Sequence, residues 1–198
     1  MPPRLDDDAP AVAPPPPLPR RVADALFDAR TVIISGGIDH DLAASVIARL
    51  TALSATSDDP ITVVVNSPGG HVESGDSIHD FIRFVRPRVR MLGSGWVSSA
   101  GALIYVAVPR EDRYCLPNTR FLLHEPSGGM RGVSSDIAIE ADQILKMRER
   151  LTQIFARQTG QTPERIREDT RRNFWLDAEA AVDYGLAGQI IERAADIR

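Results

Sequence analysis

Short apolar runs alternate with helical patterns along most of this chain. The runs, several of them rich in β-branched residues, predict buried strands at 31–34, 61–65, 89–92, 121–123 and 189–191. Apolar residues at helical spacing predict helices that begin after Asp39, near Ser99, at Ser135, at Thr162 and at Asp177, and a further helix that includes 78–85 and ends before Pro87. This alternation indicates an α/β fold in which most neighbouring strands are parallel.

Local signals mark several ends of these expected helices. Asp39 and Asp177 are suitable N-caps, and Thr162 precedes a proline at the first helical position. Pro87 and Gly185 are suitable stops. After the strand at 89–92, the glycines and serines of 93–98 predict a turn that leads into the helix near Ser99.

The beginning of the chain has a different composition from the rest. Residues 1–20 hold eight of the 15 prolines and show no periodic apolar face, which predicts a disordered or polyproline-like tail. A flexible extension without a role is the favoured interpretation, and a docking arm for a partner is the alternative. Residues 21–198 are then expected to form a single domain, and no apolar stretch in the tail resembles a secretory signal.

Composition removes several classes of function. The net charge of −4 disfavours nucleic acid and anionic membranes as partners. Lys146 is the only lysine, which excludes most Schiff-base and phosphate-loop chemistry, and Cys115 is the only cysteine, so no internal disulfide can form. The uncharged stretch 91–109 contains a purely apolar part of only seven residues, 102–108, which fits a buried strand, turn and helix better than a membrane span.

A serine-rich turn offers a nucleophile. Ser98 and Ser99 lie between an expected strand and an expected helix, among small neighbours. Such a turn can expose a hydroxyl while the N–H groups of the helix N-terminus face a developing oxyanion. Serines at helix starts are more often caps, so this pattern alone leaves both roles open.

Of the four histidines, His124 is the best placed to act as a base, because it follows a short apolar strand at the expected edge of the sheet. His40 is interpreted as part of a charged helix start, and His71 and His79 as solvated residues on a helix face. No His, Cys or Glu cluster has ligand spacing, so no metal is expected. The segment Asn66–Gly70, which ends in Pro-Gly-Gly, could supply an oxyanion N–H or form only a tight turn. From the residues alone, the chain is a candidate serine hydrolase.

Taken together, these segments resemble the Clp protease proteolytic subunit family. The resemblance covers residues 32–191, and its motifs are Asn66–Gly70, Ser98–Ala102, Arg113–Asn118, Leu123–Pro126 with Gly128 and Gly129, Thr159–Gln161, Asp169–Thr170 and Ala180–Leu186. It implies a crotonase-like α/β fold of repeated strand–helix units with a protruding handle helix, here within 125–159. It also implies a cytoplasmic serine endopeptidase without a cofactor, built as two stacked rings of seven identical subunits each.

The resemblance also implies partners and roles for individual residues. Peptides or unfolded proteins would be the substrates, and an AAA+ unfoldase driven by ATP would deliver them. Ser99 matches the nucleophile, His124 the general base, and Gly70 and Ala100 the donors of the oxyanion hole. Gly128 and Gly129 fall where the family aligns substrate peptides.

The third member of the triad departs from the family pattern. Asn173 stands where the family usually has aspartate. Asparagine can accept the imidazole N–H and orient the ring, but it cannot stabilise an imidazolium by charge. Asp169 and Asp177 are alternative partners for His124.

Further departures concern the partner surfaces. The axial-loop sequence of the family is replaced by the proline-rich tail, and Thr62 and Val64 stand where the family often has docking tyrosines, although Phe84 is kept. Arg172 matches an arginine beside the triad and is expected to pair with a carboxylate across the ring interface.

These departures leave other functions open. The main alternative is a ring subunit of low activity that supports or regulates an active paralogue. An acyl-CoA enzyme on the same fold and a Ser–Lys peptidase that uses Lys146 are weaker alternatives.

Overall fold

The computed structural model describes residues 19–126 and 132–197. The helices are α1 (Arg20–Asp28), α2 (His40–Thr56), α3 (Val72–Phe84), α4 (Ala100–Tyr105), α5 (Ser134–Thr159), α6 (Pro163–Thr170) and α7 (Ala178–Tyr184), with short 3₁₀ turns at Arg110–Asp112 and Ala194–Asp196. The strands are β1 (Thr31–Ile38), β2 (Ile61–Gly70), β3 (Val89–Ser98), β4 (Arg113–Cys115), β5 (Arg120–Leu123), β6 (Phe174–Leu176) and β7 (Gln189–Ile190). Across these two ranges, no helix is both long and apolar enough to cross a membrane.

The seven strands form one sheet in which β3 has three neighbours. The main path runs β1-β2-β3-β4-β7, and every pairing along it is parallel. The first half of β3 pairs with β4, and its second half, Trp96–Ser98, pairs with β5. The short strand β6 is antiparallel to β5. Because the second half of β3 pairs with β5 in parallel, the carboxyl ends of these two strands lie side by side.

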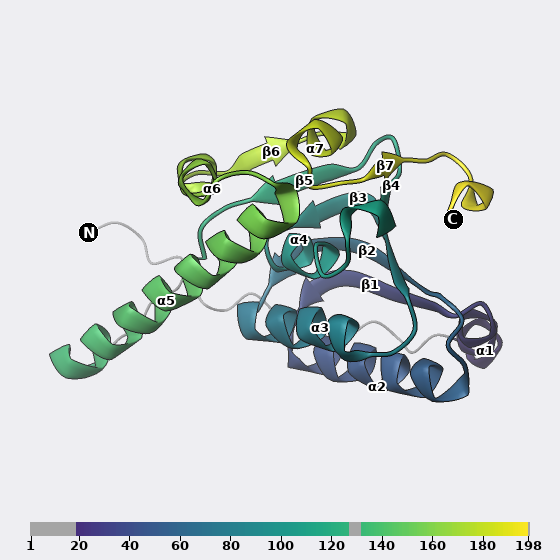
Figure 1. The fold of residues 1–198 in the computed structure, drawn as a ribbon. Helices are drawn as coiled ribbons and strands as arrows, with labels where there is room; N and C mark the ends of the chain where they lie inside the picture. The colour runs from purple at the N-terminus through teal and green to yellow at the C-terminus, as the bar shows by residue number, and fades with distance from the viewer. Residues whose placement is uncertain (1–18, 127–131, 198) are drawn as a thin grey trace, which may run out of the picture.

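Helices α2, α3 and α4 lie together against one side of the sheet (Figure 1). Residues on β2 alternate between buried and more accessible, with Ile61, Val63 and Val65 fully buried, because successive side chains of a strand point to opposite faces. Leu50 on α2 and Ile78 on α3 are likewise fully buried. This apolar layer fixes where the carboxyl ends of the central strands lie.

Helix α5 is anchored to the body at one end and extends away from it at the other (Figure 1). Its C-terminal part buries Ile154, Phe155 and Ala156, whereas Ile137 and Ile139 near its N-terminus are exposed. It is a protruding helix within the predicted range 125–159, and the α/β fold predicted from the sequence is confirmed.

Most of the predicted elements are present, and the predicted caps are confirmed. The side chains of Asp39, Thr162 and Asp177 accept hydrogen bonds from backbone N–H groups at the starts of α2, α6 and α7. Gly185 follows α7 in the left-handed conformation, which glycine adopts without the cost that a Cβ brings.

Two local interpretations are wrong. Residues 93–98 form no turn, because they continue β3 and pair with neighbouring strands. His79 is not a solvated residue: only 5% of it is exposed, and its Nδ1 lies 2.8 Å from the Asp80 carboxylate. Its acidic neighbours along the chain suggested a solvated position, but α3 packs against α2 and α4 and His79 is buried.

Three elements were not predicted: α1, β4 and β6. The expected tail, residues 1–20, lies almost wholly outside the described residues, and α1 begins at Arg20. Strands β4 and β6 have three residues each, too few for a periodic signal.

Candidate active site

Ser99 lies at the turn between β3 and α4 in a backbone conformation that is rare for residues other than glycine. Its φ is 55° and its ψ is −120°, and a strained conformation of this kind persists only where the surroundings enforce it. Its N–H donates to the carbonyl of Leu122 on β5 at 2.9 Å. Ser99 occupies the N-cap position of α4, yet its side chain makes no capping hydrogen bond. The hydroxyl is therefore not used for capping, and the geometry resembles a nucleophile turn.

Two glycines at the end of β2 allow a close approach to this turn. A Cβ on Gly69 would lie 2.6 Å from the Cβ of Ser99, and one on Gly70 would lie 2.2 Å from the carbonyl oxygen of Ile38. Both glycines have positive φ, 99° and 150°, which favours glycine. Ala100 is the first residue of α4, where a helix leaves backbone N–H groups without intrahelical acceptors.

His124 follows β5, is half-buried and lines two adjacent pockets. The first pocket, of about 20 Å³, has room for about one water molecule. It brings His124 together with Ser99, and apolar side chains form most of its wall: Val72, Ala100, Leu103, Leu123, Pro126, Leu151 and Phe155. A group bound between Ser99 and His124 would therefore meet an apolar surface.

The pairing of β5 with β6 brings Asn173 opposite His124. Leu123 pairs with Phe174 in the antiparallel register, so that His124 and Asn173 are the next residues on the two facing segments. Both line the second pocket, of about 410 Å³, together with Glu125, Thr170, Arg171 and Arg172. His124 thus lies between Ser99 on one side and Asn173 on the other.

The three side chains are neighbours without being hydrogen-bonded to one another. Among residues 19–126 and 132–197, no hydrogen bond joins the Ser99 hydroxyl to His124, or His124 to Asn173. Proton transfer needs donor and acceptor within about 2.6–3.2 Å, and apo sites are often looser than that. Transfer from Ser99 to His124 therefore requires the hydroxyl and the imidazole to come within hydrogen-bonding geometry.

The alternative partners of His124 are engaged elsewhere. Asp169 accepts hydrogen bonds from Arg165 Nε at 2.7 Å and from the Tyr184 hydroxyl at 2.9 Å, and burial together with this carboxylate raises the pKa of Tyr184. Asp177 caps α7. Neither aspartate lines a pocket with His124.

Lys146 does not approach Ser99 either. Its Nζ lies 2.7 Å from the carboxylate of Asp142, one turn away on α5, and it lines neither pocket of the site. The expected substrate-aligning residues, Gly128 and Gly129, lie outside the described residues.

Sequence reasoning missed Leu151 and Phe155, which line the Ser99 pocket from α5. Their spacing of four residues marks one face of a helix, which was a detectable signal. What that face contacts depends on the packing of α5, and the helical pattern does not contain this information.

Comparison with known proteins agrees with this geometry. The family model described as "Clp protease" matches residues 20–194. An ATP-dependent Clp protease proteolytic subunit 3 of Rhizobium etli is 58% identical over 181 residues, which are 91% of this chain and 93% of that protein. A subunit of the same name from Rhizobium meliloti is 55% identical over 98% of this chain and 100% of its own length. Subunit 2 of Pseudomonas aeruginosa is 58% identical over 85% of this chain and 84% of its own length.

Solved structures show the same fold. An Asn-to-Asp variant of ClpP1 from Listeria monocytogenes superposes with a TM-score of 0.84 at 46% identity, and the match covers 89% of this chain and 99% of that one. ClpP1 from Listeria monocytogenes itself gives a TM-score of 0.82 over the same shares at 46% identity. Because the family model spans most of its residues and relatives of this name are more than half identical to it over most of their length, the chain belongs to the Clp protease family.

Proposed function

We propose that this chain is the proteolytic subunit of a Clp-type protease, a serine endopeptidase with Ser99 as nucleophile and His124 as general base. The observation that carries the proposal is the Ser99 turn, whose hydroxyl is free of any capping bond and shares a pocket with His124. The family match supports the reaction class.

The reaction proceeds through an acyl-enzyme. The Ser99 hydroxyl oxygen attacks the carbonyl carbon of a peptide bond while His124 takes its proton. The Gly70 and Ala100 N–H groups donate to the oxyanion. His124 then gives the proton to the leaving amine as the C–N bond breaks. Water, deprotonated by His124, attacks the ester, releases the carboxylic acid and restores Ser99.

Asn173 is proposed to hold the imidazole rather than to stabilise its charge. Its amide can accept the imidazole N–H once His124 and Asn173 approach, because the β5–β6 register already places them opposite each other. An amide carries no net charge, so the imidazolium that forms in the reaction is stabilised less than beside a carboxylate. The chemical step is therefore expected to be slower than with aspartate.

The substrate is proposed to be a peptide or an unfolded protein with an apolar side chain next to the cleaved bond. Leu103, Leu151 and Phe155 line the Ser99 pocket, and burying an apolar group against them is favourable. The pocket has room for only about one water, so a side chain must widen it. Gly128 and Gly129 are proposed to align the peptide backbone.

The chain is further proposed to act in the cytoplasm as a homo-oligomer of two stacked heptameric rings. Ile137, Ile139 and Leu145 are exposed apolar residues on the protruding part of α5, which fits contact with a second copy. An AAA+ unfoldase is the proposed partner, and Phe84, 77% exposed, offers it an apolar contact. Arg172 is proposed to pair with a carboxylate of a neighbouring subunit.

A fluorophosphonate serine probe, read by intact mass, tests the nucleophile. The wild type should gain one label and Ser99→Ala none. Ser98→Ala is the matched control, because the adjacent Ser98 hydroxyl is buried and lies outside both pockets, and it should label like the wild type. Labelling that persists in Ser99→Ala would refute the assignment.

A subunit of low activity that supports an active paralogue is the second candidate. Asn173 and the missing hydrogen bonds among Ser99, His124 and Asn173 favour it. It predicts that assembled wild-type protein labels very slowly and that Asn173→Asp labels fast. Rapid turnover of model peptides by the purified wild type would exclude it.

A further inference from the structure

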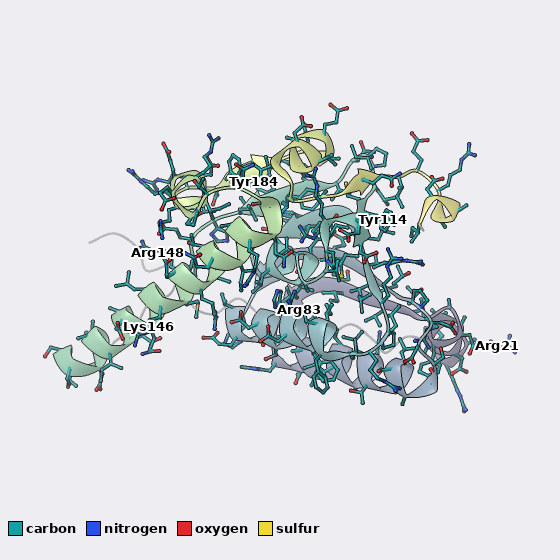
Figure 2. The ribbon with its side chains drawn as sticks, in the orientation of Figure 1. Arg21, Arg83, Tyr114, Lys146, Arg148 and Tyr184 are labelled. Carbon is teal, nitrogen blue, oxygen red and sulfur yellow. The ribbon has the colours of Figure 1, made fainter. Side chains whose placement is uncertain are left out.

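Three successive residues of α5 form ion pairs with three different segments of the protein. Arg148 lies 3.7 Å from the Glu125 carboxylate, and Glu149 accepts from Arg167 on α6 at 3.0 Å. Arg150 pairs with Asp76 on α3. We call these six side chains the α5 bracket. Figure 2 shows Arg148 on the part of α5 nearer the body and Lys146 farther out along the helix.

Each partner segment belongs to a wall of the candidate site. Glu125 directly follows His124, and its N–H donates to the Thr170 carbonyl at the end of α6 at 2.9 Å. Arg167 lies on that same helix, one turn before Thr170. One pair of the bracket thus holds the loop that carries His124, and another holds the helix to which this loop is hydrogen-bonded.

The third pair reaches the opposite wall. Asp76 lies on α3, which begins two residues after Gly70. The residue that follows the bracket on α5 is Leu151, which contacts the pocket between Ser99 and His124. The bracket therefore joins the segment after Gly70, the wall of the pocket and the His124 loop through one turn of helix.

The three pairs differ in strength because they differ in burial. The Asp76 side chain is only 18% exposed, and burial raises its pKa although Arg150 opposes the shift. Removing Arg150 alone would leave a desolvated carboxylate without its partner, which is far more costly than removing both members. The Glu149–Arg167 and Arg148–Glu125 pairs are exposed, and pairs of this kind contribute little to stability.

We propose that the α5 bracket is a positioning device for catalysis, which sets how closely His124 approaches Ser99, with Arg150–Asp76 as its dominant pair. The proposal rests on the function proposed above. Its residues touch neither substrate nor reacting atoms, and they act through the placement of the His124 loop.

The decisive variant is Arg150→Met, compared with the double variant Asp76→Leu/Arg150→Met. In Arg150→Met, kcat and the rate of fluorophosphonate labelling should both fall at least tenfold, while KM changes less than threefold. Backbone amide exchange in the peptide that contains Glu125 should accelerate. The double variant, which replaces both charges by apolar groups, should recover to within threefold of the wild type.

The exposed pair gives a second and smaller effect. Glu149→Arg and Arg167→Glu should each reduce the labelling rate about threefold, and the charge-swapped double variant should restore it. Asp142→Asn is the matched control, because it breaks the Lys146 pair, which lies within α5 and joins no other element. It should label at the wild-type rate.

The outcomes separate the inference from the proposed function. If the wild type labels at Ser99 and Arg150→Met labels equally fast, the bracket proposal is wrong and the peptidase stands. A double variant as slow as Arg150→Met would also refute the bracket, since the loss would not come from the unpaired carboxylate. If assembled wild type never labels, the proposed function fails and the bracket fails with it.

Discussion

On the Ser99 side of the site the backbone is held by the central sheet, whereas on the His124 side the loop after β5 is held largely by side chains at the surface. The Ser99 N–H bonds to β5, and Gly69 packs against Ser99 so closely that no Cβ fits. On the other side, a backbone bond from Glu125 to Thr170 and the exposed Arg148–Glu125 ion pair hold the loop.

This difference separates two requirements of acyl transfer. Donors to an oxyanion stabilise it best when they are in place beforehand, and the Ser99 side meets this requirement through packing. The hydroxyl and the base have to reach hydrogen-bonding geometry before the proton moves, and the exposed ion pair on the His124 side yields at small cost.

On the His124 side, the anchored end of α5 is held more firmly than the loop, because a buried arginine contacts it. Arg113, 1% exposed, donates to the carbonyls of Val108 at 2.8 Å and Gln158 at 2.9 Å, and to the Gln158 side chain. Burial lowers its pKa to about 10, so it remains charged at neutral pH. Arg113→Met should lower the free energy of unfolding by about 3 kcal/mol or more, because buried carbonyls lose their donors.

Chemical denaturation measures this effect. Arg113→Lys keeps the charge but not the planar fork of donors, and it should recover only part of the loss. A fully stable Arg113→Met protein would show that the end of α5 is held by apolar packing alone.

A methyl group added at Gly69, on the Ser99 side of the site, should lower kcat directly. In Gly69→Ala the new Cβ would meet Ser99 at 2.6 Å on a backbone with φ of 99°, so the Ser99 turn must shift. A displacement near 1 Å can cost about 10²-fold in rate, and kcat should fall by about that factor. Gly37→Ala is the control, since its Cβ would have nothing within 4 Å and its φ is not positive. Equal activity of the two variants would contradict a rigid Ser99 wall.

A carboxylate at position 173 should raise the catalytic rate from the His124 side of the site. Asn173→Asp adds a charge opposite His124, which stabilises the imidazolium, and kcat should rise about tenfold, which corresponds to about 1.4 kcal/mol. Peptide hydrolysis on protein of the same assembly state, checked by sedimentation, provides the measurement. An unchanged or lower kcat would mean that the approach of His124, rather than its charge stabilisation, limits the reaction.

The smallest expected effect is on the pH dependence of stability. Burial lowers the pKa of His79 from its usual value of 6.5, so below pH 6.5 the unfolded chain binds a proton that the folded chain does not. The free energy of unfolding should therefore fall on acidification, by less than about 1.4 kcal/mol per pH unit for one proton. His79→Gln should reduce this slope below pH 6.5, and a wild-type slope retained in the variant would assign it to other groups.

Much of the fold and part of the candidate site could be predicted from the sequence. The strands at 31–34 and 61–65 and the caps of α2, α6 and α7 are confirmed, because their signals are local. Ser99 and His124 carry signals in their own neighbourhoods as well. Their catalytic roles, like those of Gly70, Ala100 and Asn173, remain predictions for the experiments above.

Residues that depend on contacts distant in sequence were placed wrongly or missed. His79 has a polar and acidic neighbourhood along the chain, yet it is buried because α3 packs against other helices. Leu151 and Phe155 line the pocket only because α5 folds back over the end of β5.

The order of strands and helices, their caps and the small residues around Ser99 were determined by the sequence itself, since hydrogen bonding and backbone sterics act between near neighbours. Which side chains meet was decided by the tertiary structure. The β5–β6 register places Asn173 opposite His124, and one turn of α5 gathers Glu125, Arg167 and Asp76. Contacts of this kind depend on how whole helices and strands pack, and packing is a property of the assembled core rather than of any one segment.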